Sequence, residues 1–596
     1  MRLRGRGASA GPDEAVSRRP SAAGPWEPPP IREYGLLGDT RTAALTSLAG
    51  SIDWMCWPRF DSEPVFGRLI DNEFGGCFEI AVQGATHTER RYRDRSAVLE
   101  TTWESGSGRA TLAEALAMGV ASPVLVRRLE CTAGSVRVRV RYDPRPGLPG
   151  TGREAPIALS LRPSIRVGPE APAELELRHG QSLTAVLTDR DRPVSPTRGT
   201  ELLGDADRWW RAWSGTIQAG QHYREVLIRS LINLRLLTYT PTGAPVAAPT
   251  TSLPEELGGV RNWDYRFSWP RDASVGAAAF LAVGKRSEAQ AFVDWLMKCA
   301  CREEAPIRVL YDLDGERAQP ERELSGVSGY RGSLPVRVGN LAEEQHQLDV
   351  YGWVVDALWN LVDTGGKLGR DGRRAMAEYA DFVVDSWRRP DAGLWEVRDE
   401  PAHHVHSKVW AWIALDRAAR TAHALGMSRA RTARWERERD LLAEDIKLRG
   451  FDADRGCYVR SYGSPELDCA LLLLPLTGFE GGGQERLSST VDAIWRELGA
   501  GGPLLYRYPP GHDGLPGAEG AFVPCSFWLL EALLRLGRRD EGLRLFEQVL
   551  DLANELLLLP EEIDPGTGAY LGNYPLALSQ AGLVHAVTEV QRVLDV

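Results

Sequence analysis

The spacing of apolar side chains changes along this chain from the period of strands to the period of helices. From about residue 31 to 200, apolar and charged residues alternate between turns rich in Gly and Pro, as in "SVRVRVRYD" (135–143) and "AELELR" (173–178). Similar short runs are "VLVRRLEC" (124–131) and "IALSLRPSIRV" (157–167). Many short strands of this kind are typical of an antiparallel sandwich. We therefore expect a β-sandwich domain over residues 31–204.

After residue 220 the apolar positions recur with the period of a helix. Leu227, Leu231 and Leu234, for example, share one helical face. We count about twelve such segments, which start near residues 222, 271, 285, 343, 370, 404, 428, 464, 485, 521, 538 and 575. This number fits six helical hairpins closed into an α/α toroid over 222–596. A helical solenoid would give a similar number, but the chain has no repeat of fixed length. Between the two halves, 205–221 is expected to form a helical linker.

Composition narrows the class of protein. The 596 residues are 43% apolar and 26% charged, which is typical of a globular protein with more than one domain. The net charge of -10 argues against a nucleic-acid partner, and no apolar run is long enough to cross a bilayer. Residues 1–30 lack the apolar core of a secretion signal, so we expect a disordered leader and a cytoplasmic protein.

Metal-ligand spacing is absent from the chain. The eight cysteines are scattered and form no CxxC pair. The histidines of "HHVH" (403–406) have no nearby carboxylate pattern, so packing or capping is the expected role. Tryptophan is the commonest aromatic residue, with 19 copies, and its flat indole suits both core packing and stacking on sugar rings. We predict no metal site.

One inter-helix segment, "GGVRNWDYRFSWPRDAS" (258–274), carries more aromatic and charged residues than a connector needs. A helix start would explain its proline and its last aspartate. It would not explain Trp263, Trp269 or Arg271. A guanidinium beside a carboxylate, here Arg271 and Asp272, can hold two hydroxyls of a pyranose while indoles stack on its faces. We expect sugar binding at this segment.

Two further segments place carboxyl groups in loops. In "GLWE" (393–396), Trp395 would partly desolvate Glu396 and raise its pKa, as a general acid requires. An ordinary surface glutamate beside a packing tryptophan is the other interpretation. In "LLLLPEEIDPGTGAYLGNYP" (556–575), Glu561 and Glu562 follow an apolar run and a proline, where a solvated turn would also fit. Two carboxyl groups facing each other about 6.5 to 9.5 Å apart are the machinery of inverting glycoside hydrolysis.

Taken together, these segments resemble glycoside hydrolase family 15, the glucoamylase family, in its bacterial two-domain form. The resemblance covers nearly everything after residue 30. It is carried by "YGLLGDTRTAALTSLAGSIDWMCWPRFDS", "LLTYTPTGAPVAAPTTSLPEELGGVRNWDYRFSWPRDAS", "GYRGSLPVRVGN", "GLWEVRDEP", "HSKVWAWIALDRA", "DGLPGAEGAFVPCSFWLLEAL" and "EEIDPGTGAYLGNYPLALSQAGLVHAV". It implies a β-sandwich followed by an (α/α)6 barrel, attack at the nonreducing end with inversion, and no organic cofactor.

The resemblance also assigns roles to residues. It makes Glu396 the general acid and Glu561 the general base. The predicted substrate-binding residues are Arg271, Asp272, Trp269, Trp263, Trp395 and Glu562. The segment "GNLAEEQHQLDVYG" (339–352) departs from the family pattern, because Glu343 and Glu344 stand where small residues are usual, and this leaves the identity of the leaving sugar open.

The function expected from these residues is that of an inverting exo-α-glucosidase. It would release β-D-glucose from an oligosaccharide or disaccharide α-glucoside. Glucoamylase-like action on α-1,4 linkages is placed ahead of trehalase action, although the motifs do not separate the two. A disaccharide phosphorylase and a non-catalytic glycan-binding protein stay open as alternatives. A prenyl cyclase is disfavoured because no DDxxD run is present. The sequence does not predict the oligomeric state.

Overall fold

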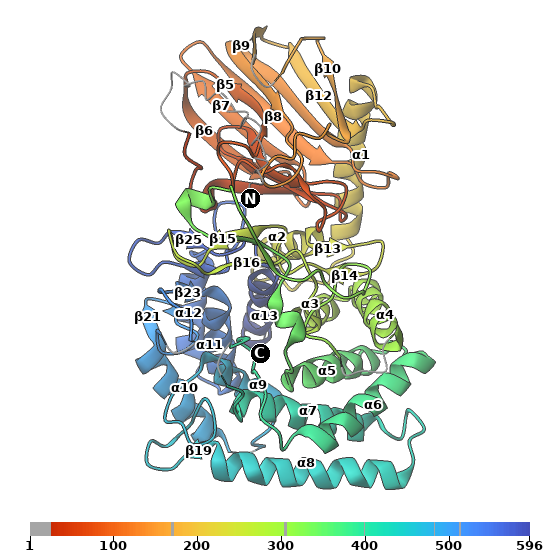
Figure 1. The fold of residues 1–596 in the computed structure, drawn as a ribbon, viewed down its shortest axis with the longest axis vertical. Helices are drawn as coiled ribbons and strands as arrows, with labels where there is room; N and C mark the ends of the chain where they lie inside the picture. Colours follow the sequence, from red (N-terminus) through yellow and green to blue (C-terminus); the bar gives the residue numbers. More distant parts are fainter. Residues whose placement is uncertain are drawn as a thin grey trace, which may run out of the picture.

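The computed structural model describes residues 26–168, 172–302, 307–397, 400–481, 483–511 and 514–595, and it consists of a β domain followed by a larger helical domain (Figure 1). Most of the predicted leader, 1–25, lies outside these residues. Its last part is not disordered. The Arg68 guanidinium lies 4.1 Å from the centre of the Trp26 ring, and the Tyr330 hydroxyl donates to the carbonyl of Pro29 at 3.0 Å. Residues 26–30 are thus held by contacts with both domains.

The β domain is an antiparallel sandwich, as predicted. Its strands are β1 (Tyr34–Gly38), β2 (Ala43–Ser47), β3 (Ser51–Cys56), β4 (Pro64–Phe66), β5 (Cys77–Val82), β6 (Ala85–Tyr92), β7 (Leu99–Ser105), β8 (Gly108–Leu116), β9 (Leu125–Asp143), β10 (Ile157–Arg162), β11 (Ala173–Arg178) and β12 (Ser182–Asp189). The long strand β9 links the two sheets, because its first half pairs with β8 and β12 and its second half with β5 and β11. In that second half Val136, Val138 and Val140 are buried, which is the alternation seen in the sequence.

The helix that connects the domains begins earlier than predicted. Helix α1 spans Pro196–Ser214, so it starts within the range assigned to the sandwich and ends before residue 221. Two ordinary signals set its start. Pro196 stands in the first turn, and the Ser195 hydroxyl accepts a hydrogen bond from the backbone N–H of Arg198. The sequence prediction overlooked this cap because the tryptophans farther along the segment marked the helix more strongly.

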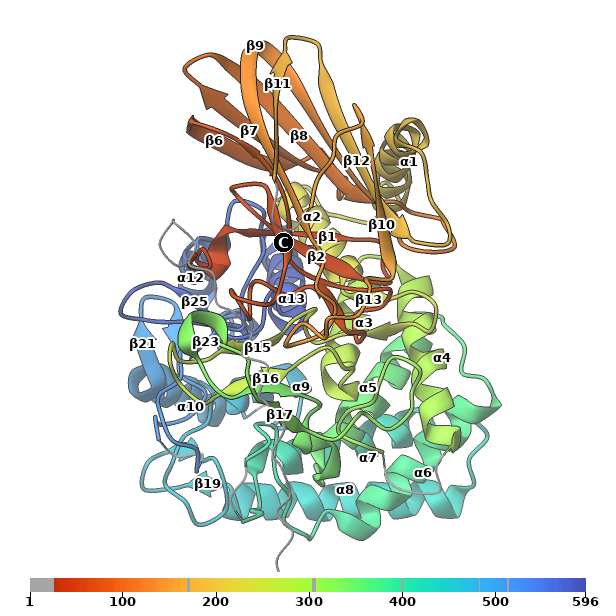
Figure 2. The same cartoon turned by 45° about the horizontal axis from the view of Figure 1, so that its top comes forward.

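The helical domain is a closed ring of helix pairs (Figure 2). The outer helices are α2 (Arg224–Leu236), α4 (Arg286–Arg302), α6 (Arg370–Ser386), α8 (Arg429–Arg449), α10 (Gln484–Leu498) and α12 (Arg539–Leu550). The inner elements are α3 (Pro270–Ala282), α5 (Asp349–Asp363), α7 (Val405–Thr421), the 3-10 turn η4 (Cys469–Leu473) with α9 (Leu474–Thr477), α11 (Val523–Arg535) and α13 (Ala577–Leu594). Each inner element packs against the next, and α13 returns to α3. This closure confirms the toroid over the solenoid.

Two predicted helix starts differ from the structure. The segment near residue 343 is a separate 3-10 turn, η3 (Leu341–Glu344), and helix α5 starts only at Asp349. The predicted start falls on the acidic pair at 343–344, and acidic side chains are favourable in the first turn of a helix. The segment near residue 464 forms η4 and the four-residue α9 instead of a full inner helix. Pro475 removes a backbone donor there, which favours a short element.

Short two-stranded and three-stranded sheets lie in the loops of the ring. They are β13 (Thr238–Tyr239) with β14 (Ala244–Pro245), β15 (Thr251–Pro254) with β16 (Asn262–Asp264), β17 (Arg322–Leu324) with β18 (Val336–Val338), β19 (Phe451–Asp452) with β20 (Cys457–Tyr458), β21 (Gly499–Gly501) with β22 (Leu504–Leu505), and β23 (Ala521–Phe522) with β24 (Glu562–Ile563) and β25 (Tyr570–Leu571). The η1 turn (Ile31–Glu33) and η2 turn (Tyr330–Gly332) complete the elements.

The β13–β14 and β15–β16 hairpins lie between the β domain and the helices of the ring (Figure 1). The indole N–H of Trp54 donates to the carbonyl of Pro249 at 2.8 Å, and the Tyr574 hydroxyl donates to the carbonyl of Tyr34 at 2.8 Å. All four of these residues are buried. The β domain therefore supports the loops that enter the inner helices. Among the described residues, no helix combines the length and the apolar character needed to span a membrane.

Candidate active site

The segments that precede the inner helices surround a cavity with two adjoining parts. The outer part, which we call the outer cavity, has a volume of about 450 Å³, and the inner part, which we call the inner chamber, has a volume of about 70 Å³. Tyr265, Trp395, Glu396 and Arg507 line both parts. The inner part is also lined by most of the residues that the sequence singled out, namely Trp269, Arg271, Asp272 and Glu561. Ring closure thus brings together loops that are far apart in the chain.

Glu396, the predicted general acid, lies in the loop before α7. Its Oε1 accepts a hydrogen bond from the indole N–H of Trp269 at 2.8 Å and lies 3.6 Å from Nη1 of Arg271. Burial raises the pKa of Glu396 above its usual range, although Arg271 and the indole N–H act in the opposite direction. The aromatic contact differs from the expected one. Trp395 directs its own indole N–H to Asp468 at 2.9 Å, so Trp269 is the tryptophan that orients this carboxyl group.

Glu561, the predicted general base, is held at both carboxylate oxygens. The Tyr265 hydroxyl donates to Oε1 at 2.7 Å, and the backbone N–H of Asn573 donates to Oε2 at 2.9 Å. The residue is 1% exposed. Burial, and next the charge of Glu255, raise the pKa of Glu561 to about 8, while the Tyr265 hydrogen bond lowers it. The carboxyl group therefore has one fixed orientation at the wall of the inner chamber.

Arg271 and Asp272 occupy the first turn of α3, directly after Pro270. Nε of Arg271 donates to Oδ1 of Asp272 at 2.7 Å, and Nη1 of Arg271 donates to the carbonyl of Leu394 at 2.9 Å. Both side chains are about a tenth exposed and line the inner chamber. A guanidinium and a carboxylate fixed side by side present donors and acceptors that match the vicinal hydroxyls of a sugar.

A buried cluster of charges lies behind Glu561. The Nη2 atom of Arg507 is 2.6 Å from Oε2 of Glu519 and 3.1 Å from Oε2 of Glu255. The same atom is 3.3 Å from Oε1 of Glu562, and Nη1 of Arg261 is 3.3 Å from Oε2 of Glu519. Burial raises the pKa of Glu562 well above its usual range. Three carboxyl groups thus share the positive charge of two guanidiniums.

Glu562 does not line the cavity, although the sequence placed it among the substrate-binding residues. It is fully buried, and its Oε2 accepts the backbone N–H of Gly520 at 2.7 Å. Successive side chains of an extended segment point to opposite sides, so Glu561 faces the chamber while Glu562 faces the charge cluster. Glu562 is therefore too far inside the protein to touch a sugar directly.

The same cluster is the one group of acidic, His or Cys side chains in the described ranges that is close enough to hold a metal ion. Ligand atoms of Glu255, Glu519 and Glu562 lie within 4.8 Å of one another. The guanidinium of Arg507 contacts all three carboxyl groups and takes the position that a cation would occupy. We assign no metal to it.

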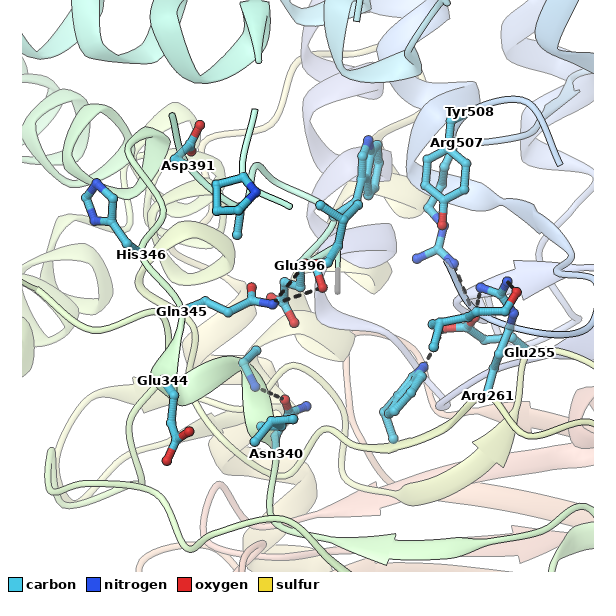
Figure 3. Close-up of a pocket in the computed structure, with 18 of the residues that line it drawn as sticks. Glu255, Arg261, Asn340, Glu344, Gln345, His346, Asp391, Glu396, Arg507 and Tyr508 are labelled. Carbon is cyan, nitrogen blue, oxygen red and sulfur yellow. Dashed lines mark hydrogen bonds and ion pairs between the residues drawn. The ribbon is translucent and has the colours of Figure 1, made fainter. Parts of the chain in front are cut away.

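The outer cavity holds the remaining predicted residues. Trp263 lines it and donates its indole N–H to Oε1 of Glu255 at 3.0 Å. Of the two acidic residues that depart from the family pattern, Glu344 lines the cavity. Glu343 is buried and paired with Arg317 at 2.9 Å. Figure 3 shows Glu396 on one side of this space and the Glu255, Arg261 and Arg507 group on the other.

Several site residues were missed by the sequence prediction. Tyr265 lies inside the segment 258–274 and Glu255 just before it, while Glu519 lies in "DGLPGAEGAFVPCSFWLLEAL". A signal was thus present, because these segments carry the family resemblance. Arg507 lies outside every segment that carries the family resemblance, and only the fold brings it to the site.

Comparisons with known proteins agree with this arrangement. Residues 221–588 match the family model of glycosyl hydrolases family 15, and residues 18–161 match the model of the trehalase-like N-terminal domain. A trehalase of Mycolicibacterium smegmatis is 35% identical, with 98% of this chain and 95% of the relative covered. A trehalase of Mycobacterium tuberculosis is 35% identical, with 95% and 90% covered, and one of Thermoplasma volcanium is 32% identical, with 95% and 94% covered.

Among solved structures, a bacterial glucoamylase complexed with acarbose superposes with a TM-score of 0.70 at 14% identity. The match covers 97% of this chain and 96% of that chain, so the two proteins share both domains of the fold. The fold, the site segments and the family model lead to one conclusion: the chain is a glycosidase that belongs to glycoside hydrolase family 15.

Proposed function

We propose that this glycosidase is an inverting trehalase in which Glu396 is the general acid and Glu561 the general base. The observation that carries the proposal is that two buried carboxyl groups, each oriented by its own donors, line one inner chamber beside the Arg271–Asp272 pair. The substrate is inferred from the relatives, since the trehalases match this chain over nearly its whole length. This favours the trehalase alternative over the glucoamylase-like function, which was the first expectation from the sequence.

In the proposed reaction, one glucose of trehalose is held at Arg271 and Asp272, and the other lies in the outer cavity. Glu396 protonates the glycosidic oxygen while Glu561 takes a proton from the water that attacks the anomeric carbon from the opposite face. The bond from that carbon to the glycosidic oxygen breaks as the new bond to water forms. Solvent exchange then returns one proton to Glu396 and removes one from Glu561. The attacked ring leaves as β-D-glucose and the other as α-D-glucose.

The hydrogen bonds at the two carboxyl groups suit these roles. The indole N–H of Trp269 and the guanidinium of Arg271 stabilise the carboxylate that Glu396 becomes after it has given its proton. The hydroxyl of Tyr265 and the N–H of Asn573 favour the ionised form of Glu561, which is the form that a base must have.

The experiment is to incubate the purified protein with trehalose and to follow the anomers of glucose by proton NMR before they mutarotate. Inverting hydrolysis gives equal amounts of the α and β anomers at early times, whereas retaining hydrolysis gives only the α anomer. Parallel incubations contain maltotriose, or trehalose with phosphate. If glucose were released from maltotriose but not from trehalose, the trehalase assignment would be overturned in favour of the glucoamylase-like one. If glucose 1-phosphate formed, and only in the presence of phosphate, the result would favour a phosphorylase.

Substitution of the base separates catalysis from simple binding of a glycan. We expect Glu561→Gln to lower kcat on trehalose by about a thousandfold, within the range for general base catalysis, while trehalose still binds. The matched control is Glu378→Gln on the outer helix α6, where the side chain is half exposed and paired with Arg374. If Glu561→Gln and the control turned over trehalose equally, Glu561 would have no part in the mechanism.

A further inference from the structure

The backbone at Glu396 has a conformation that few side chains adopt. Its φ is 59°, in the left-handed region that is uncommon for residues other than glycine. Such a residue costs free energy and persists only where its surroundings fix it. Gly393, three residues before Glu396, also has a positive φ, of 72°, and its carbonyl accepts the N–H of Glu396 at 3.3 Å. The loop that carries Glu396 is therefore a tight turn that needs external support.

Gln345 supplies contacts to that turn. Its Nε2 donates to the carbonyl oxygen of Glu396 at 3.1 Å and to that of Val397 at 3.3 Å. In Figure 3 the amide of Gln345 points at the Glu396 loop across the edge of the cavity. The Nε2 of Gln347 donates to Oε1 of Gln345 at 3.3 Å, and this contact leaves the NH2 group of Gln345 facing the two carbonyls. Gln345 therefore touches the backbone of Glu396 and not its carboxyl group.

Neighbouring contacts fix Gln345 itself to the same loop. The carbonyl of His346 accepts the N–H of Ala392 at 3.0 Å, and Oδ2 of Asp391 accepts the N–H of Leu348 at 3.0 Å. On the other side, Asn340 caps the η3 turn that ends just before Gln345, with its side chain accepting the N–H of Ala342 at 3.0 Å. The segment 340–348 is thus held at both ends and runs along the loop 391–397.

We propose that Gln345 is a positioning residue, which holds the Glu396 loop in the left-handed turn that aims its carboxyl group at the inner chamber. This inference rests on the proposed function, because it assumes that Glu396 protonates the leaving oxygen. Without the amide donors, the two carbonyls lose their partners and the turn can relax to an ordinary φ. The carboxyl group then leaves Trp269, while Glu561, Arg271 and Asp272 keep their own contacts. Only the acid step is impaired.

A pair of substrates tests this separation. Trehalose has an alkoxide leaving group that needs a proton, whereas α-D-glucosyl fluoride releases fluoride with little assistance from an acid. The variant is Gln345→Met, which keeps the length of the side chain and removes both donors. We expect kcat on trehalose to fall about tenfold or more, with KM changed by less than about threefold, because the loss is part of the general-acid contribution. With the fluoride as substrate, we expect kcat to fall by less than about threefold.

The pH profile gives a second readout. Burial is the largest influence on the pKa of Glu396 and raises it, whereas the Arg271 charge and the Trp269 hydrogen bond lower it. A looser loop with more water around the carboxyl group weakens the largest of these influences, so we expect that pKa to fall. The alkaline limb of kcat on trehalose should then move to lower pH in Gln345→Met. Gln345→Glu, which is shaped like glutamine but cannot donate to the carbonyls when ionised, serves as the second variant if the first does not fold. Gln290→Met on the exposed face of α4 is the control for loss of a glutamine amide.

The outcomes separate the inference from the function on which it rests. Equal losses on both substrates would mean that Gln345 acts only through general stability, and a higher KM with unchanged kcat would mean that it binds the leaving sugar directly. Either result overturns the inference. The turnover of trehalose and of α-D-glucosyl fluoride by Glu396→Gln is measured in parallel with that of Gln345→Met. If that variant loses trehalose and fluoride turnover alike, Glu396 is not the acid and the proposed function fails; if it spares the fluoride and Gln345→Met does not, only the inference fails.

Discussion

The phenol of Tyr265 donates a hydrogen bond to Oε1 of Glu561 over 2.7 Å. The ring of the same tyrosine packs edge-on against Trp269, with 5.6 Å between the ring centres. Trp269 in turn donates its indole N–H to Glu396. One aromatic pair therefore orients both carboxyl groups of the inner chamber, and a change at either ring should reach the chemistry of both.

Tyr265→Phe should move the acidic limb of activity to higher pH. The lost hydroxyl stabilises the ionised form of Glu561, so its removal raises the pKa of Glu561 further above its usual range. A base with a higher pKa is ionised only at higher pH, and activity below that pH is lost. A hydrogen bond to a charged group contributes about 1.5 to 3 kcal/mol, so we expect kcat/KM on trehalose near pH 6 to fall about tenfold or more.

The measurement for Tyr265→Phe is the pH dependence of kcat/KM on trehalose for the variant and the parent protein. Tyr142→Phe is the control, since that hydroxyl lies in the β domain and has no hydrogen-bond partner among the residues that the structure describes. An acidic limb that stays in place in Tyr265→Phe would show that this hydroxyl does not tune the base.

Glu255→Gln should have the opposite effect on the acidic limb. After burial, the charge of Glu255 is the largest influence that raises the pKa of Glu561. Replacing that charge by a neutral amide lowers the pKa of Glu561, so the base stays ionised to lower pH and the acidic limb moves down. Glu256→Gln is the matched control, because its side chain accepts the backbone N–H of Ala518 and lies outside the cavity lining. A shift in the same direction as that of Tyr265→Phe would contradict the electrostatic account.

The sequence predicts the architecture better than it predicts the contacts within the site. The alternation of apolar and charged residues along 135–143 and the helical periodicity after residue 220 both reflect which side of an element is buried. Such patterns can be recognised from the sequence alone. The pairing of Trp269 with Glu396 joins residues 127 positions apart, and that of Tyr265 with Glu561 joins residues 296 apart. Both pairings depend on closure of the ring.

The resemblance to the family identified the loops that line the cavity, but it did not predict which side chain of each loop faces the inner chamber. Glu562 illustrates the limit. It is adjacent to Glu561 and equally acidic, and only the extended backbone, which sends neighbours to opposite sides, separates their environments. In the same way, Trp395 is adjacent to Glu396 in sequence, yet Trp269 makes the contact. Adjacency in a loop says little about direction.

Stability of the β domain should depend on one buried ion pair. Nε of Arg127 on β9 donates to Oε1 of Glu114 on β8 at 2.7 Å, and both side chains are fully buried. Removing one partner leaves the other charge uncompensated, which costs about 3 kcal/mol. We expect Glu114→Gln to destabilise the protein by that amount in urea unfolding. Glu130→Gln, whose partner Arg128 is a third exposed, should change stability by less than about 0.5 kcal/mol. Equal effects would refute the ion-pair argument.

Two glycines after the proposed base give a matched test of how tightly it is held. Gly568 and Gly572 have φ values of 72° and 70°, so an alanine at either position carries the same backbone strain of about 1 kcal/mol. Their surroundings differ. A Cβ at Gly568 would meet nothing within 4 Å, whereas a Cβ at Gly572 would lie 2.7 Å from Cβ of Glu561 and 2.9 Å from its Cδ.

We therefore expect both Gly568→Ala and Gly572→Ala to lower the unfolding temperature, Gly572→Ala by more because its Cβ also meets Glu561, and only Gly572→Ala to lower kcat on trehalose, by about a hundredfold. The physical reason is that a shift of about 1 Å in a catalytic group can cost a factor of that size. The measurement is kcat at saturating trehalose together with thermal unfolding of both variants. Full activity in a folded Gly572→Ala protein would show that Glu561 tolerates displacement, and so that its orientation by Tyr265 and Asn573 does not limit the reaction.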